Sequence, residues 1–256
     1  MEGIRGRSAI VTGAGSGIGR EIALLFASEG AKVVVAELNE AAGRETERMI
    51  RDSGGEAIFL RTDVSLDGDC ASAVRLARES FGSVDVLINN AGIDGRPAPV
   101  ADIDPADLDR IMRVNFTGAF LMCRHALREM AGQRRGSIVN IASLGGLIPV
   151  HNGMPYSASK AALIMLTRSI AAEYGRYGVR ANAIAPGWAE TDMVRRYAEQ
   201  SSIDPQEFRR AVSRRAPLGR LATTRDVADL ALFLCSDRAS YITGQTYVID
   251  GGLSVT

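Results

Sequence analysis

Three side chains in the middle of the sequence have the chemistry to move a proton at an alcohol oxygen. Tyr156 and Lys160 are four residues apart, which places both on one face of a helix, a turn from each other. An ammonium beside a phenol favours the phenolate, so this spacing predicts a tyrosine pKa below its usual ~10. Such a tyrosine can take a proton from an alcohol or give one to a carbonyl. Ser143, at the end of an apolar run, is placed to hydrogen-bond the same oxygen.

Two consecutive elements must hold these residues. The apolar run 138–142 predicts a strand that ends at Ser143, and a glycine-rich loop follows it. Residues 155–176 predict a helix, with proline in its first turn. Alone, a tyrosine and a lysine at this spacing also fit a helix with a chance tyrosine and a surface lysine. Their meaning therefore depends on the rest of the chain.

A glycine-rich turn joins the first predicted strand to a helix. The turn has the sequence TGAGSGIG, residues 12–19. Gly13 permits a tight turn, Gly17 lets the backbone approach a pyrophosphate, and Gly19 allows a helix to pack closely on the strand. The start of the helix adds free N–H groups and a partial positive charge. The segment predicts a dinucleotide site, or else a plain strand–helix turn.

The second predicted strand, residues 32–39, carries the residue that selects the cofactor. Glu37 follows the glycines by about 20 positions, where an acidic side chain binds the ribose 2′-hydroxyl of NAD and repels the 2′-phosphate of NADP. Ser16 lies in the glycine turn at a place where a basic residue would suit NADP. Glu37 and Ser16 together predict that the cofactor is NAD. The alternative for Glu37 is a solvated strand end.

Further polar residues follow other predicted strands. Asp63 and Val64 end the strand predicted over 57–64, where an adenine edge can meet them. The sequence NNAG, residues 89–92, ends the strand predicted over 84–92. Open α/β sheets bind their ligands at the carboxyl ends of strands, so we expect these residues near the cofactor.

A long helix is predicted over 104–130, with an interruption near Asn115 and Gly118. Asparagine is a poor helix former and needs a hydrogen-bond partner when buried. Asn115 could therefore make a structural hydrogen bond or take part in a catalytic relay, and the sequence favours neither role.

The composition is that of a globular protein without a dominant charge. The chain has 256 residues, 46% hydrophobic and 23% charged, with 30 basic and 30 acidic side chains. Zero net charge argues against nucleic acid or an anionic membrane as partner. The only lysines are Lys32 and Lys160. Cys70, Cys123 and Cys235 lie far apart, which predicts reduced thiols and neither disulfides nor a metal site. With no leader or membrane span recognised, we expect a cytoplasmic protein.

The order of elements predicts one domain over residues 1–256. Six alternating β and α units and a last strand indicate a doubly wound, Rossmann-like parallel sheet of seven strands with helices on both faces. Residues 188–215 break the alternation and predict a helical lid. The lid combines apolar anchors with six arginines. We expect these arginines to face solvent, although they could instead bind an anionic substrate.

Taken together, the motifs resemble the short-chain dehydrogenase/reductase family over essentially the whole chain. The order and spacing of the motifs make the resemblance specific. It rests on TGAGSGIG at 12–19, Asp63-Val64, NNAG at 89–92, Asn115, Ser143, YSASK at 156–160 and PGWAET at 186–191.

The resemblance implies a role for each matched residue. Tyr156 is the expected general acid/base, and Lys160 is expected to lower its pKa and to hold the nicotinamide ribose. Ser143 would orient the substrate oxygen, Asn115 would bind a water that joins Lys160 to solvent, and Thr191 would hold the carboxamide. The residues implied for the cofactor are Gly13, Ser16, Gly17, Ile18, Gly19, Glu37, Asp63, Val64, Asn89, Ala91, Gly92, Tyr156, Lys160, Pro186, Gly187 and Thr191.

We therefore expect an NAD-dependent oxidoreductase that interconverts a secondary alcohol and a ketone without a metal. A homotetramer is expected, because the helices at 104–130 and 155–176 have more apolar surface than one sheet face needs. One alternative is a 3-oxoacyl-thioester (acyl-carrier-protein) reductase using NADPH, which the lid arginines favour and Glu37 does not. Another is a non-catalytic dinucleotide-binding regulator. The sequence does not identify the substrate. It also does not decide whether His151 contacts the substrate.

Overall fold

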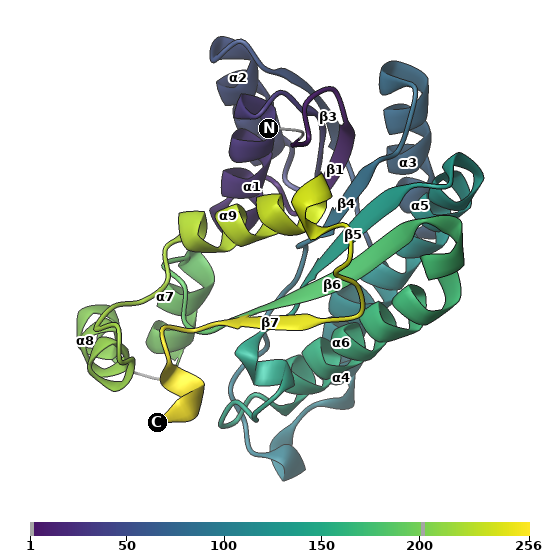
Figure 1. Cartoon of the computed structure of the whole chain (residues 1–256). Coiled ribbons are helices and arrows are strands. Elements are labelled where there is room, and N and C mark those ends of the chain that lie inside the picture. The colour runs from purple at the N-terminus through teal and green to yellow at the C-terminus, as the bar shows by residue number, and fades with distance from the viewer. Residues whose placement is uncertain (1–2, 201–202) are drawn as a thin grey trace.

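A computed structural model describes residues 3–200 and 203–256 of the chain (Figure 1). Seven parallel strands form one sheet in the order β3-β2-β1-β4-β5-β6-β7, which confirms the predicted doubly wound sheet. The strand order reverses between β1 and β4, so a crevice opens at their carboxyl ends. The strands are β1 (Ser8–Thr12), β2 (Lys32–Glu37), β3 (Glu56–Arg61), β4 (Val86–Asn89), β5 (Gly136–Ile141), β6 (Val179–Pro186) and β7 (Thr246–Ile249).

Helices cover both faces of this sheet (Figure 1). They are α1 (Gly17–Ser28), α2 (Glu40–Asp52), α3 (Asp67–Phe81), α4 (Pro105–Met112), α5 (Ala119–Gln133), α6 (Met154–Tyr174), α7 (Asp192–Gln200), α8 (Pro205–Arg215) and α9 (Thr224–Cys235). Strand residues alternate between two cores: Val11 packs with α1 and α9, and Ile10 packs with α3 and α5. Because both faces are covered, the central strands read as continuous apolar runs.

Local signals set several helix starts. Asn39 caps α2 by accepting a hydrogen bond from the Ala42 amide at 3.1 Å. Thr223 and Asp226 form a capping box at the start of α9. The predicted helix over 104–130 is α4 and α5 joined by a π-helical segment, Arg113–Gly118, which confirms the expected interruption.

Two predicted strands are shorter than the sequence indicated. The third ends at Arg61, so Asp63 and Val64 lie beyond it in the turn to α3. The fourth spans only Val86–Asn89. In both cases the ladder ends where the sequence turns polar: the last pairs are Glu37 with Arg61 and Asn89 with Asn140.

The segment predicted as a lid forms α7 and α8 beside the end of β6 (Figure 1). Residues 201 and 202 of this segment lie outside the described residues. Three aromatic rings join its parts: Trp188 lies 5.2 Å from Tyr197 and 4.9 Å from Phe208, measured between ring centroids. Such tilted and edge-on contacts are the favoured aromatic geometries. Among the described residues, no helix is long and apolar enough to span a bilayer.

Candidate active site

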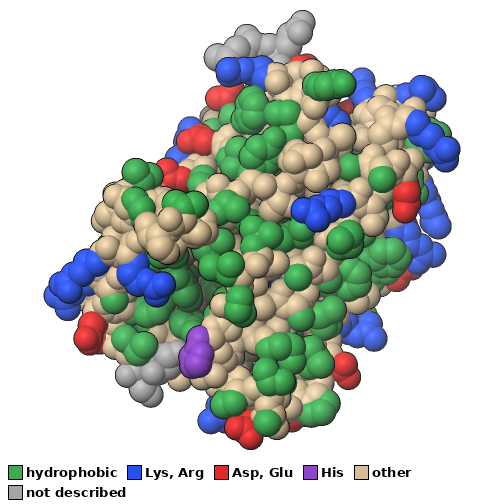
Figure 2. Space-filling view, turned by 60° about the horizontal axis from the view of Figure 1, so that its bottom comes forward, with side chains coloured by type: hydrophobic (Ala, Val, Ile, Leu, Met, Phe, Trp, Pro, Cys, Tyr) green, Lys and Arg blue, Asp and Glu red, His purple; other side chains and the backbone are tan. Residues whose placement is uncertain are grey.

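A cavity of about 1280 Å³ lies at the carboxyl ends of β4, β5 and β6, under the lid. Figure 2 shows a hollow on this side of the molecule, with green apolar side chains around it. Ser143, Tyr156 and Lys160 line the cavity together with Ile18 of the glycine turn and Trp188 of the lid. The structure therefore brings the three predicted catalytic residues to one place, next to the predicted dinucleotide site.

The glycine turn is fastened to the end of β4. Thr12 Oγ1 accepts hydrogen bonds from the backbone amides of Asn90 and Ala91, both at 3.0 Å. Gly13 has φ +62°, and a Cβ on it would lie 2.9 Å from the Ala91 Cα. A Cβ on Gly19 would lie 2.2 Å from the Gly13 carbonyl oxygen, so both positions need glycine. The two predicted motifs thus form one rigid cradle beside the helix N-terminus.

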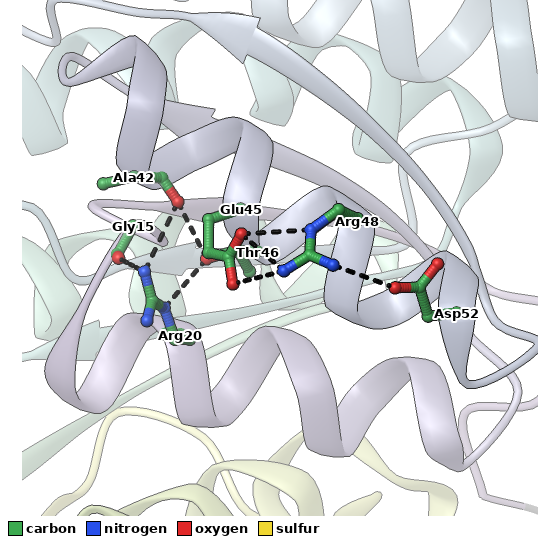
Figure 3. A network of polar contacts seen from close by, with 7 residues as sticks. All are labelled: Gly15, Arg20, Ala42, Glu45, Thr46, Arg48 and Asp52. Atoms are coloured by element: carbon green, nitrogen blue, oxygen red, sulfur yellow. Dashed lines mark hydrogen bonds and ion pairs between the residues drawn. The ribbon is translucent and has the colours of Figure 1, made fainter.

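A second set of contacts supports the same turn from the side of α2 (Figure 3). The fully buried Thr46 donates from Oγ1 to the Ala14 carbonyl at 2.9 Å and accepts from Arg20 Nε at 3.0 Å. Arg20 Nη2 also donates to the Gly15 carbonyl. Sequence reasoning missed Arg20 and Thr46, because the turn carbonyls that they bind are not visible in a side-chain pattern.

Glu37, the residue expected to select the cofactor, lies at this turn. Its Oε2 accepts from the Gly15 amide and its Oε1 from the Asn39 amide, both at 2.9 Å. These two bonds hold the half-buried carboxylate beside the glycine turn. Ser16 is exposed at the start of α1.

Asn89 and Asn90, neighbours in the predicted NNAG motif, have opposite surroundings. The Asn89 side chain is buried in the sheet, where Nδ2 donates to Asn140 Oδ1 at 2.8 Å. Asn90 lines the cavity and donates from Nδ2 to the Thr12 and Gly13 carbonyls. The side chain that faces the site is thus the one our cofactor set omitted, because successive residues of a strand point to opposite faces.

Asp63 and Val64 are held in the turn between β3 and α3. Asp63 Oδ1 accepts from the amide and hydroxyl of Ser65 at 2.9 and 2.7 Å. Val64 is buried, and its carbonyl accepts from Cys70 Sγ. Neither residue lines the cavity itself.

Tyr156 and Lys160 stand in the first two turns of α6. Lys160 is only 4% exposed, its Nζ donates to the Ile141 carbonyl at 2.8 Å, and it lies 5.7 Å from the centre of the Tyr156 ring. Burial lowers the pKa of Lys160 to about 8. Ser143 Oγ accepts from the Gly145 amide at 3.0 Å.

The expected lowering of the Tyr156 pKa is not what the structure gives. Burial raises this pKa above its usual 10, a hydrogen bond with the Ser143 side chain lowers it, and the charge of Asp94 raises it. Lys160 directs its ammonium at the Ile141 carbonyl, and burial weakens its hold on the proton. The prediction from spacing was wrong because it ignored desolvation of the phenolate.

Asn115 links the π-helical segment to the cavity wall. Its Oδ1 accepts from the Ile93 amide at 2.8 Å, and its Nδ2 donates to the Ile93 carbonyl at 2.9 Å and to Ser159 Oγ at 3.0 Å. The side chain is therefore satisfied by the protein, which favours a structural role for it. A Cβ on Gly92 would lie 3.4 Å from Lys160 Nζ, so Lys160 is directly beneath this loop.

The segment after β6 closes the other side of the site. Pro186, Gly187 and Thr191 all line the cavity. A Cβ on Gly17 would lie 3.5 Å from Thr191 Cγ2, so this threonine faces the start of α1. A backbone cradle, a helix N-terminus and a facing threonine fit a bound nicotinamide dinucleotide.

The lid brings its apolar residues, and not its charges, to the cavity. Met193, Tyr197 and Phe208 line the cavity. The lid arginines are all exposed: Arg195, Arg196, Arg209, Arg210, Arg214 and Arg215. This confirms the expectation that they face solvent, although Arg215 also borders the cavity.

Two further features of the site concern metals and His151. Within residues 3–200 and 203–256, no group of three or more His, Cys, Asp or Glu side chains is arranged to hold a metal ion. His151 is exposed at the cavity, and its carbonyl accepts from the Tyr197 hydroxyl at 3.4 Å.

Comparison with known proteins agrees with this geometry. Residues 13–254 match the family described as enoyl-(acyl carrier protein) reductase. A cis-4-hydroxycyclohexanecarboxylate dehydrogenase of Sinomonas cyclohexanicum is 41% identical over 246 residues, 96% of each chain. A 2-(S)-hydroxypropyl-CoM dehydrogenase of Xanthobacter autotrophicus is 37% identical over 244 residues, 95% of each. The crystal structure of levodione reductase has a TM-score of 0.96 at 34% identity and covers 98% of this chain and 99% of that chain.

Fold and site together define an oxidoreductase that binds a nicotinamide dinucleotide. The chain belongs to the short-chain dehydrogenase/reductase family, as its motifs predicted. Solved relatives include one with NAD⁺ bound and one in complex with NADP. The preference of this chain for one of the two cofactors must therefore be inferred from its own residues.

Proposed function

We propose that the protein is an NAD-dependent dehydrogenase that interconverts a secondary alcohol and a ketone, with Tyr156 as acid/base. The observation that carries the proposal is the meeting of Ser143, Tyr156 and Lys160 in one apolar cavity that reaches the glycine turn. Hydride transfer between a carbinol carbon and a nicotinamide requires matched proton transfer at oxygen, and these residues supply it.

Each residue then has one task. The glycine turn, Glu37 and Thr191 would hold a nicotinamide dinucleotide, which would supply hydride exchange with the substrate carbon. Tyr156 removes the hydroxyl proton in oxidation and donates it in reduction. Ser143 hydrogen-bonds the same oxygen, and its bond to Tyr156 stabilises the phenolate. Lys160 adds positive charge beneath the ring.

The raised pKa of Tyr156 gives the reaction a direction of pH dependence. At neutral pH the phenol keeps its proton, so the free site is prepared to protonate a ketone. Oxidation needs the phenolate and should accelerate as the pH rises towards the pKa of Tyr156.

The NAD preference is supported by Glu37. Its carboxylate, held by the Gly15 and Asn39 amides, is placed to accept from a ribose hydroxyl. A 2′-phosphate at that place would meet a like charge. The alternative of an NADPH-dependent 3-oxoacyl-thioester reductase lacks this support, because the lid arginines face solvent. A non-catalytic regulator would not require the set of Ser143, Tyr156 and Lys160.

We also propose a cytoplasmic homotetramer. The three cysteines are buried and free, which suits a reducing compartment. On the helices expected to pair, α5 leaves Phe120 44% exposed and α6 leaves Met165 57% exposed. Burial of such side chains against symmetry mates would remove apolar surface from water.

The test is reduction of NAD⁺ and NADP⁺ by a panel of secondary alcohols and hydroxyacyl thioesters, with wild type and Tyr156→Phe. We expect NAD-dependent alcohol oxidation and a kcat lower by about 10²–10⁴ in the variant, since the ring stays and the proton is lost. Tyr174→Phe, in the same helix but outside the cavity, is the control. A Tyr156→Phe enzyme with a tenth of wild-type turnover, chemistry being rate-limiting, would refute the role.

A further inference from the structure

The reaction described above gives no task to Asp94, a charged side chain of the cavity. Asp94 follows β4 and lines the cavity. Its Oδ2 is enclosed and has no hydrogen-bond partner among the residues that the structure describes. Buried carboxylate oxygens are normally paired, and leaving one unpaired costs free energy.

The other carboxylates around the cavity differ from Asp94. Asp104 caps α4 by accepting from the Ala106 amide, and Asp107 pairs with Arg110 at 3.0 Å. Asp102 is exposed to solvent. Asp94 alone combines a position in the cavity with an enclosed, unpartnered oxygen in the described part of the chain.

The backbone on both sides of Asp94 is held firmly. Asn115 bonds the amide and the carbonyl of Ile93 at 2.8 and 2.9 Å. On the other side, a Cβ on Gly95 would lie 2.5 Å from Ile111 Cδ1, so the chain packs directly on α4. These contacts fix the backbone from which the Asp94 side chain enters the cavity.

The same carboxylate acts against the chemistry of the site. Of the carboxylates at the cavity, only Asp94 affects Tyr156 by its charge, and it disfavours the phenolate that oxidation requires. The cations that border the cavity are Arg96, Lys160 and Arg215. None of them forms an ion pair with Asp94 in the described chain, so the charge is left for a ligand. An unpaired charge that costs folding free energy is expected at positions that serve function.

We propose that Asp94 is a specificity-determining residue that accepts a hydrogen bond from a second donor, a hydroxyl or an ammonium, carried by the substrate close to its reacting carbinol. This inference rests on the proposed alcohol dehydrogenase activity and names its substrate class: diols, hydroxyketones and amino alcohols. The second group is not consumed. The carbinol loses hydride to the cofactor and a proton to Tyr156, and the neighbouring donor leaves unchanged.

The expected discrimination follows from the charge of the acceptor. A hydrogen bond to a charged group contributes about 10- to 100-fold in binding. A substrate without the donor would leave the carboxylate unpaired in the complex. We therefore expect kcat/KM for 1,2-cyclohexanediol or 2-aminocyclohexanol to exceed that for cyclohexanol by about that factor.

The experiment compares wild type, Asp94→Leu, Asp94→Asn and Asp102→Leu on these three alcohols with NAD⁺. Asp94→Leu should lose the preference: its kcat/KM for the donor-bearing alcohols should fall to that for cyclohexanol. Asp102→Leu, which removes an exposed carboxylate from the same cavity, should keep the preference. A preference for the diol alone identifies the donor as a hydroxyl. A preference for the amino alcohol alone identifies it as an ammonium.

Asp94→Asn provides a readout that a merely structural role would not move. Loss of the negative charge should lower the pKa of Tyr156, so the rise of cyclohexanol oxidation with pH should shift to lower pH. This variant keeps the shape of the side chain and guards against misfolding of the leucine variant.

The outcomes separate this inference from the proposed function. Wild type that oxidises cyclohexanol and the diol equally well keeps the dehydrogenase activity and overturns the role of Asp94. Wild type that oxidises none of the alcohols contradicts the proposed function. In that case the role of Asp94 is tested by measuring alcohol binding. The signal is the fluorescence of Trp188, which is the only tryptophan of the chain and lines the cavity. The quantity compared is the alcohol concentration that gives half of the maximal fluorescence change. The same concentration for the diol, the amino alcohol and cyclohexanol would overturn the inference. A tenfold lower concentration for a donor-bearing alcohol would support it.

Discussion

Lys160→Met should remove a folding penalty that the wild-type protein carries for its function. The ammonium is 4% exposed, and burial lowers its pKa from 10.5 to about 8. A lysine that binds its proton more weakly in the folded state than in the unfolded state opposes folding at low pH. Methionine fills a similar volume without charge, so it should be free of this penalty.

The size of the penalty follows from the two pKa values. Each tenfold change in proton affinity corresponds to about 1.4 kcal/mol, which makes the wild-type penalty about 3 kcal/mol. It is fully present below pH 8 and is lost as the pH rises through 10.5, because above that pH both states are neutral at this position. Loss of the bond to the Ile141 carbonyl offsets part of the gain by about 1–3 kcal/mol at every pH.

The free energy of unfolding should be measured by urea denaturation between pH 7 and 10.5 at one protein concentration. Relative to Lys160→Met, the wild type should gain about 3 kcal/mol between pH 8 and 10.5. Lys32→Met is the control, because Lys32 is the other lysine of the chain and starts β2, where its ammonium lies 3.4 Å from a Glu56 carboxylate oxygen. The difference between the Lys160→Met and Lys32→Met curves then gives the part of the pH dependence that is specific to Lys160.

Parallel curves for wild type and Lys160→Met would refute the reasoning, since they would mean that Lys160 titrates alike in the folded and unfolded states. The variant should also lose most activity. Stability gained together with activity lost would identify the buried ammonium as a functional cost.

Three further predictions concern the cofactor, the lid and the assembly. Glu37→Ala should narrow the kcat/KM preference for NAD over NADP by about tenfold or more, because a like-charge repulsion of about 1–4 kcal/mol is lost; a wild type that prefers NADP would contradict it. The double variant Arg209→Ala with Arg210→Ala should leave KM for a neutral ketone unchanged at any salt concentration, whereas selective loss of thioester substrates would favour the reductase alternative. Light scattering should give a tetramer, and a stable monomer at micromolar concentration would exclude it.

The fold was predictable because its signals are local. The central strands are apolar without interruption, since helices cover them on both faces, and the turns between them have the glycines, prolines and caps that such connections need. The glycine turn and the tyrosine–lysine pair could be placed at strand ends for the same reason. Even the π-helical segment left a trace in the sequence, an asparagine and a glycine within an apolar helix.

Several properties of the site depend on residues far apart in the sequence. Whether Asn89 or Asn90 faces the cavity depends on the last residue of β4 and its pairing with β5. The lid is partly accessible to sequence reasoning: its helices and apolar anchors were predicted, and its ordering by substrate stays a prediction.

By itself the sequence determined the elements, their order and the residue types at each strand end, because these follow from hydrophobic periodicity and turn chemistry within short windows. The tertiary structure decided the electrostatics. It raised the pKa of Tyr156, lowered that of Lys160 and left an Asp94 oxygen without a partner. The physical reason is that desolvation and hydrogen-bond satisfaction are set by atoms from other segments, which only the folded chain brings together.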